Sequence, residues 1–286
     1  MKSLSVLGVR ALALGLVMSA MGLQAQQQGM EVSADMVLPQ PPPTAPLGDW
    51  TVAAGREKVT LERGGGVVLR GWSFASAKAG APTVLFFNDN DMTVDHSESL
   101  YRSIAAAGAQ VVVFDYRGYG FSMGEAGVAA FRADAAAEYD FAVKRAGGPV
   151  VVYGFAMGTA IATSVAVQRP VKGMILAGTI ASAAEEIPVY AKTQGLTDED
   201  LKGIKLDAGV VEAFDLVGRV KKSKAPLLML HGGADKMVPM AQGRKVFAAS
   251  AAGEKKFVVL PGVGHQQTAG SAVGLKAVGM FLSGLK

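Results

Sequence analysis

The chain has 286 residues, 50% of them apolar, which is enough for one large domain with a full hydrophobic core. Its formal net charge of +4 gives no case for binding to nucleic acid or to an anionic membrane. The sequence contains no cysteine, which excludes disulfides, thiolate chemistry and cysteine-ligated metals.

Residues 1–25 are predicted to be a secretory signal peptide. Lys2 and Arg10 flank an apolar run, and the segment ends in a cleavage-site pattern, Leu23-Gln24-Ala25. The run is too short to span a bilayer, although a retained anchor stays open as an alternative. Cleavage would remove two of the 28 basic residues and leave 26 against 24 acidic ones, a formal charge of +2. We therefore expect a periplasmic or secreted protein with no stable membrane span.

Residues 26–49 are expected to be a leader. This segment is rich in glutamine and proline, a composition that stays extended and solvated instead of packing. The folded domain is therefore expected over residues 50–286.

Short apolar runs alternate with helix-length segments through that domain. Six runs are apolar on both faces, as in buried parallel strands: residues 83–87, 111–114, 150–153, 174–177, 227–230 and 257–260. Two earlier apolar stretches, 59–61 and 67–69, flank three glycines and predict an antiparallel hairpin. The expected fold class is α/β, with a mostly parallel central sheet and helices on both faces.

Two helices have readable ends. Asp95 and Glu98 have the spacing of a capping box for a helix through residues 100–107. The next helix is expected to begin near Val128 and to end before Gly147.

Two similar pentapeptides lie 34 residues apart. The first, residues 120–124, reads Gly-Phe-Ser-Met-Gly and matches the serine-hydrolase pattern G-x-S-x-G. The second, residues 154–158, reads Gly-Phe-Ala-Met-Gly and has alanine where that pattern has serine. Only one of them can be the nucleophile elbow, the sharp turn that presents a reactive residue at a sheet edge.

The second copy has the context that an elbow requires. A predicted strand runs into Gly154, and a helix of small residues opens at Gly158, so that Ala156 occupies the nucleophile position. Ser122 lies instead in a glycine-dense loop, which predicts a structural role. A substitute role for Ser122 as nucleophile stays open as an alternative.

Three further motifs give the chain a resemblance. Residues 115–124, 231–239 and 261–265 resemble the α/β-hydrolase superfamily, in its serine-aminopeptidase and lysophospholipase-like branch, over residues 55–285. The resemblance implies that Asp235 is the catalytic acid and His265 the catalytic base. The non-catalytic alternative is that Asp235 caps a turn and His265 is a surface residue.

The same resemblance implies an oxyanion hole, in which backbone N–H groups bind the charged oxygen of the reaction intermediate. Met157 is the expected first donor, and Asn90 is the candidate for the second. The branch usually has a His-Gly pair at the position where this chain reads Asn88-Asp89. Asp89 and Asp91 therefore bring negative charge close to the place where an oxyanion would form.

No nucleotide, flavin or metal motif is present, and no cofactor or metal is expected. The nearest metal candidate is a Ca²⁺ site at Asp89, Asp91 and Asp95, which lacks the glycine and distal glutamate of an EF-hand loop. Residues 179–224 form the longest segment between predicted strands and are expected to be a small helical cap.

Two functions follow. The first is a serine-type hydrolase of esters, lipids or peptides in which alanine has replaced the nucleophile and activity is lost or strongly impaired. The second is a pseudoenzyme, an exported protein that binds a small molecule, peptide or lipid on a hydrolase scaffold.

Overall fold

The computed structural model describes residues 31–33, 50–51, 54–148, 150–193, 195, 197–199, 201–202 and 204–285. The predicted signal peptide and most of the predicted leader lie outside these described residues. Within the described ranges, no helix combines the length and the apolar character needed to cross a membrane.

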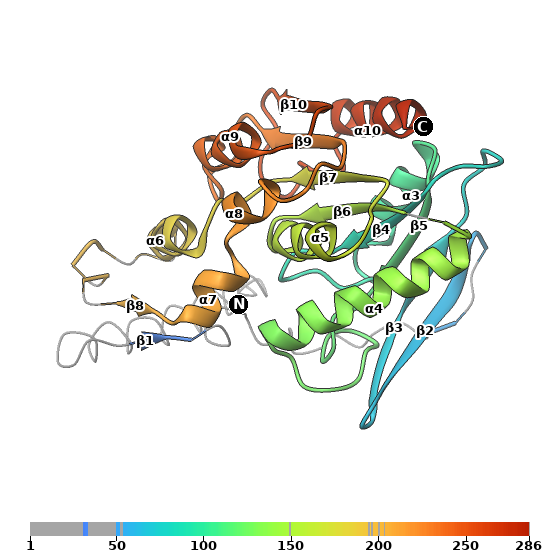
Figure 1. The fold of residues 1–286 in the computed structure, drawn as a ribbon, viewed down its shortest axis with the longest axis horizontal. Coiled ribbons are helices and arrows are strands. Elements are labelled where there is room, and N and C mark those ends of the chain that lie inside the picture. Colours follow the sequence, from blue (N-terminus) through green and yellow to red (C-terminus); the bar gives the residue numbers. More distant parts are fainter. Residues whose placement is uncertain are drawn as a thin grey trace, which may run out of the picture.

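An eight-stranded sheet forms the centre of the domain (Figure 1). In spatial order its strands are β10 (Lys255–Leu260), β9 (Leu227–Gly232), β7 (Gly173–Ala177), β6 (Val151–Phe155), β4 (Thr83–Phe87), β5 (Gln110–Phe114), β3 (Val67–Phe74) and β2 (Arg56–Gly64). All neighbours from β10 to β5 pair in parallel, whereas β2 and β3 form the predicted antiparallel hairpin at one edge. The expected mostly parallel sheet is confirmed.

Alternate residues of each strand supply two separate cores, because successive side chains of a strand point to opposite faces. Val84 and Phe86 of β4 pack in the core that contains α3 (Glu98–Ala106) and α10 (Ala272–Gly284). Leu85 and Phe87 pack in the core that contains α4 (Val128–Ala146) and α5 (Met157–Gln168). Helices therefore cover both faces, which explains why the strands are apolar without a polar side.

The two predicted helix ends had different outcomes. The prediction for α4 is confirmed, because its C-cap is Gly147 with φ of 71°. The capping box at the start of α3 is wrong, because Ser97 is the N-cap residue and no side-chain hydrogen bond caps the helix. Asp95 lies two residues before that cap.

The segment between β7 and β9 projects beside the sheet (Figure 1). It contains α6 (Ala183–Thr193), β8 (Lys205–Leu206), α7 (Ala208–Ala213) and α8 (Leu216–Val220), and α9 (Met240–Ala249) follows β9. β1 (Glu31–Val32) pairs in parallel with β8, and Val32 is buried. These two leader residues thus pack on the segment, which differs from the solvated state expected for them.

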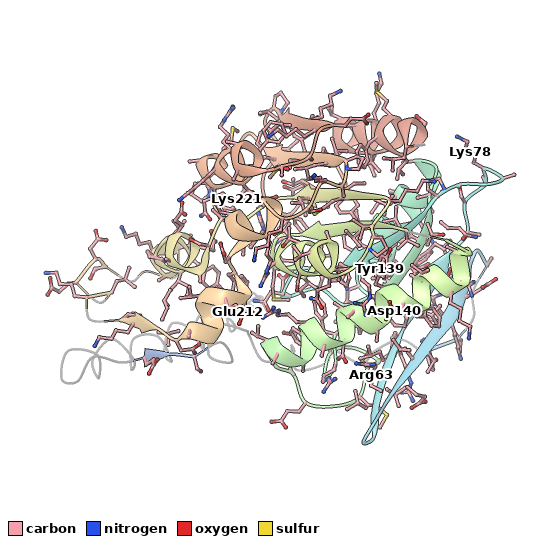
Figure 2. All side chains as sticks on the ribbon, viewed as in Figure 1. Arg63, Lys78, Tyr139, Asp140, Glu212 and Lys221 are labelled. Atoms are coloured by element: carbon pink, nitrogen blue, oxygen red, sulfur yellow. The ribbon has the colours of Figure 1, made fainter. Side chains whose placement is uncertain are left out.

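Arg219 of α8 ties this segment to the body of the domain. Its buried guanidinium donates to the carbonyl oxygens of Ala160 at 3.0 Å, Ala213 at 2.8 Å and Glu212 at 2.5 Å. Burial lowers the pKa of Arg219 to about 10, and the positive charge of Arg132 adds to the shift. Arg132 of α4 also pairs with Glu212, which Figure 2 places on α7. Two cations therefore hold α7 and α8 over α4 and α5.

Candidate active site

The turn between β6 and α5 is strained at Ala156. This residue has φ of 46° and ψ of −112°, and among the described residues it is the only one other than glycine with a positive φ. Such a conformation costs on the order of 1–3 kcal/mol and is concentrated at functional sites. The structure thus places Ala156 at the kind of strand-to-helix turn that the sequence predicts.

Glycine is required on both sides of this turn for a steric reason. A Cβ atom at Gly154 would lie 2.3 Å from the carbonyl oxygen of Gly158. One at Gly158 would lie 2.1 Å from the carbonyl oxygen of Phe87. The helix therefore crosses β6 and β4 at a distance that no larger residue permits.

Ser122 is bound into the scaffold. Its hydroxyl accepts a hydrogen bond from the N–H of Arg70 at 2.9 Å and donates to the carbonyl oxygen of Asp115 at 2.7 Å. Asp115 in turn accepts from the N–H groups of Val94 and Phe121 with its two carboxylate oxygens. The serine of the first pentapeptide thus fastens its own loop to β3.

Asp235 and His265 meet at the carboxyl ends of β9 and β10, which are neighbours in the sheet. Nδ1 of His265 lies 2.7 Å from Oδ2 of Asp235. The other carboxylate oxygen of Asp235 accepts from the N–H groups of Met237 at 3.0 Å and Val238 at 2.9 Å. Burial opposes ionisation of Asp235, but these bonds and the charge of His265 lower its pKa overall. The pair is therefore built as an anchored carboxylate that orients an imidazole.

His265 lies between two carboxylates. Its Nε2 atom is 3.8 Å from Oδ2 of Asp89, and its ring stacks on Phe155 with centroids 5.2 Å apart. Burial alone would lower the pKa of His265, but Asp235 and Asp89 raise it to about 10. Both carboxylates thus favour the imidazolium form, a state in which the ring can give up a proton but cannot accept one.

We expect His265 to titrate near pH 10. A histidine whose pKa rises on folding stabilises the fold fully below its unfolded pKa, about 6.5, and loses that contribution as the pH rises through the folded value. NMR of the imidazole Cε1 proton checks this, since the chain has only three histidines. Asp89→Asn should lower the measured pKa, and titration near pH 6.5 in the unaltered protein would contradict the arrangement.

Two backbone N–H groups converge on a single oxygen atom beside this pair. The N–H of Asn90 lies 2.7 Å from Oδ1 of Asp89, and the N–H of Met157 lies 3.2 Å from the same atom. The structure thus brings together the two donors that the sequence predicts for an oxyanion hole.

A cavity of about 170 Å³ opens in front of these groups. It is lined by residues of the β4 loop, the elbow, α6 and the loops after β7, α7, β9 and β10: Asp89, Asn90, Asp91, Ala156, Met157, Ile180, Glu186, Ile187, Tyr190, Phe214, Met237, Val238 and His265. Ser122 is not among these lining residues. Ala156 and His265 therefore line the same cavity, and Ser122 of the first pentapeptide does not line it.

The cap contributes a further carboxylate to the cavity, that of Glu186. Glu186 of α6 accepts a hydrogen bond from Nε2 of Gln242 at 2.7 Å, and Oε1 of Gln242 accepts from the N–H of Ala181 at 2.8 Å. Burial raises the pKa of Glu186 to about 7. No local pattern marks Gln242, because its partners lie 56 and 61 residues away in the chain.

Metal binding was the remaining alternative for the aspartates of the β4 loop. Among the residues that the structure describes, no group of three or more histidine, aspartate or glutamate side chains is arranged to hold a metal ion. Asp89 is instead directed to the N–H groups of Asn90 and Met157.

The sequence matches the family described as serine aminopeptidase, S33, over residues 81–210 and 210–269. An uncharacterized protein of Mycobacterium tuberculosis is 30% identical over 244 residues, which cover 83% of each chain. The lysophosphatidylserine lipase ABHD12 of Macaca fascicularis is 30% identical over 223 residues, 73% of this chain and 52% of the relative. This chain thus spans about half the length of that lipase.

Solved structures agree on the fold. The Pyrococcus furiosus esterase Pf2001 superposes with a TM-score of 0.65 at 17% identity, covering 86% of this chain and 97% of the esterase. The esterase domain of a Rhodothermus marinus protein gives a TM-score of 0.58 at 21% identity, over 79% and 95% of the two chains. The expected α/β-hydrolase fold is therefore confirmed.

Proposed function

We propose that the cavity of this chain, which belongs to the serine aminopeptidase S33 family of α/β-hydrolases, is a serine-hydrolase site. Alanine stands at the nucleophile position of that site. The observation that carries this proposal is the Asp235–His265 pair, 2.7 Å apart, on the cavity that Ala156 also lines. An oriented imidazole on an anchored carboxylate serves a nucleophile, and a methyl group offers neither a proton nor a lone pair. Hydrolysis is therefore absent or strongly impaired in this sequence.

Each remaining group has a role in such a site. Asp235 orients His265 and stabilises its imidazolium, and Nε2 of His265 exchanges a proton with the nucleophile and the leaving group. The N–H groups of Met157 and Asn90 are the oxyanion donors. In a comparable triad, loss of the nucleophile alone costs about as much as loss of all three residues, on the order of 10⁶-fold.

An acyl ester is the substrate class that we propose for the site. Apolar side chains from several segments line the cavity beside the elbow: Ile180, Ile187, Phe214 and Met237. These apolar side chains suit a short acyl chain, since apolar walls bind such ligands. The name lysophosphatidylserine lipase, carried by a relative that is 30% identical, supports this class.

The alternative function is an exported binding protein that has lost catalysis altogether. The contact of Asp89 with both oxyanion donors favours it, because the contact adds a second departure from a working site. Export depends on residues 1–25, which lie outside the described residues, and a periplasmic or secreted location stays a proposal. Analysis of the mature N-terminus in cell fractions tests it.

Ala156→Ser distinguishes the two functions. A working acid–base pair should let the introduced serine react with a fluorophosphonate probe and hydrolyse p-nitrophenyl butyrate, whereas the unaltered protein should do neither. Ser122→Ala in the same background is the control and should leave the reaction in place. Labelling of the unaltered protein would contradict the proposed impairment, and an Ala156→Ser variant that stays silent even with Asp89→Ala added would favour the binding protein.

A further inference from the structure

The oxygen atom on which the two N–H groups converge belongs to the protein itself. An oxyanion hole is recognised by donors that lie about 2.7–3.1 Å from one charged oxygen. Oδ1 of Asp89 lies 2.7 Å from the N of Asn90, within this range, and 3.2 Å from the N of Met157, just beyond it. A carboxylate oxygen is also chemically close to an oxyanion, since it carries negative charge and accepts two hydrogen bonds.

The second oxygen of Asp89 faces the proposed base. Oδ2 lies 3.8 Å from Nε2 of His265, the nitrogen that would exchange a proton with a nucleophile. One side chain thus spans the two donors and the base, and it is almost fully buried, with 7% of Asp89 exposed. In an acyl transfer the carbonyl oxygen would need the position of Oδ1, and the nucleophile or leaving group would need the position of Oδ2 beside Nε2.

We propose that Asp89 is a built-in occupant of the oxyanion hole, an autoinhibitory contact that competes with acyl substrates for the site independently of the alanine at position 156. This inference rests on the proposed function, because that function identifies the two N–H groups as oxyanion donors. Its physical basis is that two anions cannot share one pair of donors. A bound carboxylate also stabilises His265 as imidazolium, which removes the base.

The neighbouring carboxylate provides a matched comparison. Asp91 lines the same cavity two residues further on, but it is exposed, whereas Asp89 is buried against the donors. A general effect of negative charge would act through both residues. Occupation of the hole acts through Asp89 only.

Butyrate binding to the protein that retains Ala156 tests the occupation directly. At pH 6, where His265 is protonated, Asp89→Ala should bind butyrate at least about tenfold more tightly than the unaltered protein, since it frees two donors and removes a like charge. NMR should show the amide signals of Asn90 and Met157 shifting on titration. Asp89→Asn removes the charge but keeps an oxygen in the hole and should gain clearly less than Asp89→Ala, and Asp91→Asn should change binding by no more than about threefold.

Fluorophosphonate labelling in the Ala156→Ser background adds a kinetic test. Loss of one oxyanion donor typically costs about 10²–10³-fold in rate, so Asp89→Ala should raise the labelling rate of Ala156→Ser by about 10²-fold or more. Thermal denaturation reports whether each variant is folded. If Asp89→Ala is not folded, Asp89→Gly is a second variant that removes the carboxylate from the oxyanion hole.

The outcomes separate this inference from the proposed function. Tight butyrate binding by Asp89→Ala with no labelling of either serine variant would support the occupied hole and overturn the hydrolase site. Labelling of Ala156→Ser at a rate that Asp89→Ala leaves unchanged, with butyrate binding also unchanged, would overturn the autoinhibitory contact and leave the hydrolase site standing. Equal gains from Asp91→Asn and Asp89→Ala would also overturn it, because charge and not occupation would then be the cause.

Discussion

Asp235→Asn, added to Ala156→Ser, is expected to lower fluorophosphonate labelling by about 10³–10⁴-fold. The amide removes the charge that orients the imidazole and stabilises its protonated form, 2.7 Å from Nδ1 of His265. Its remaining oxygen can still accept from the N–H groups of Met237 and Val238, so the loop should keep its shape. Labelling rates measured by mass spectrometry give the ratio.

Circular dichroism of the same variant provides the folding control for this prediction. A cooperative melting transition with labelling lost would assign Asp235 to the proposed catalytic pair. A decrease in the labelling rate of less than about tenfold would instead support the non-catalytic alternative, in which Asp235 only caps its turn.

Gly158→Ala is expected to destabilise the domain by about 3 kcal/mol or more, at the upper end of overpacking effects. The added Cβ would lie 2.1 Å from the carbonyl oxygen of Phe87 and 2.7 Å from that of Asn88. Both neighbours are backbone atoms, so relief requires α5 to move away from β4. Urea denaturation measures the free energy of unfolding.

Gly253→Ala is the matched control for that substitution. A Cβ atom there would meet no atom within 4 Å, and we expect the free energy of unfolding to change by about 0.5 kcal/mol or less. Equal stability of the two variants would contradict the close crossing at the elbow.

Much of this fold is predictable from the sequence because its physical cause is local. Runs such as residues 83–87 are apolar without alternation, and the structure shows why: Val84 faces one core and Leu85 the other. The elbow is predictable for a similar reason, since only glycine fits beside Ala156 at positions 154 and 158.

The contacts of Asp89 could not be predicted in the same way. The sequence indicates negative charge near the hole, but the bond to Met157 joins residues 68 positions apart and depends on where a loop and a helix start meet. The same holds for Glu186 and Gln242, which pair across 56 positions. Side-chain contacts between distant segments leave no periodic signal, whereas strands and turns do.

The pairing of β1 with β8 has a similar explanation. Composition correctly indicates an extended chain around Glu31, but an extended segment can either be solvated or join an edge strand. Burial of Val32 against the cap decides between these states, and composition does not encode it.

We propose that position 156, and not position 122, is the nucleophile position of this site. Peptide mapping after fluorophosphonate treatment tests it most directly, in the unaltered protein and in Ala156→Ser. We predict no adduct on the unaltered protein and a single adduct on the serine introduced at position 156. An adduct on Ser122 in either protein would contradict the claim.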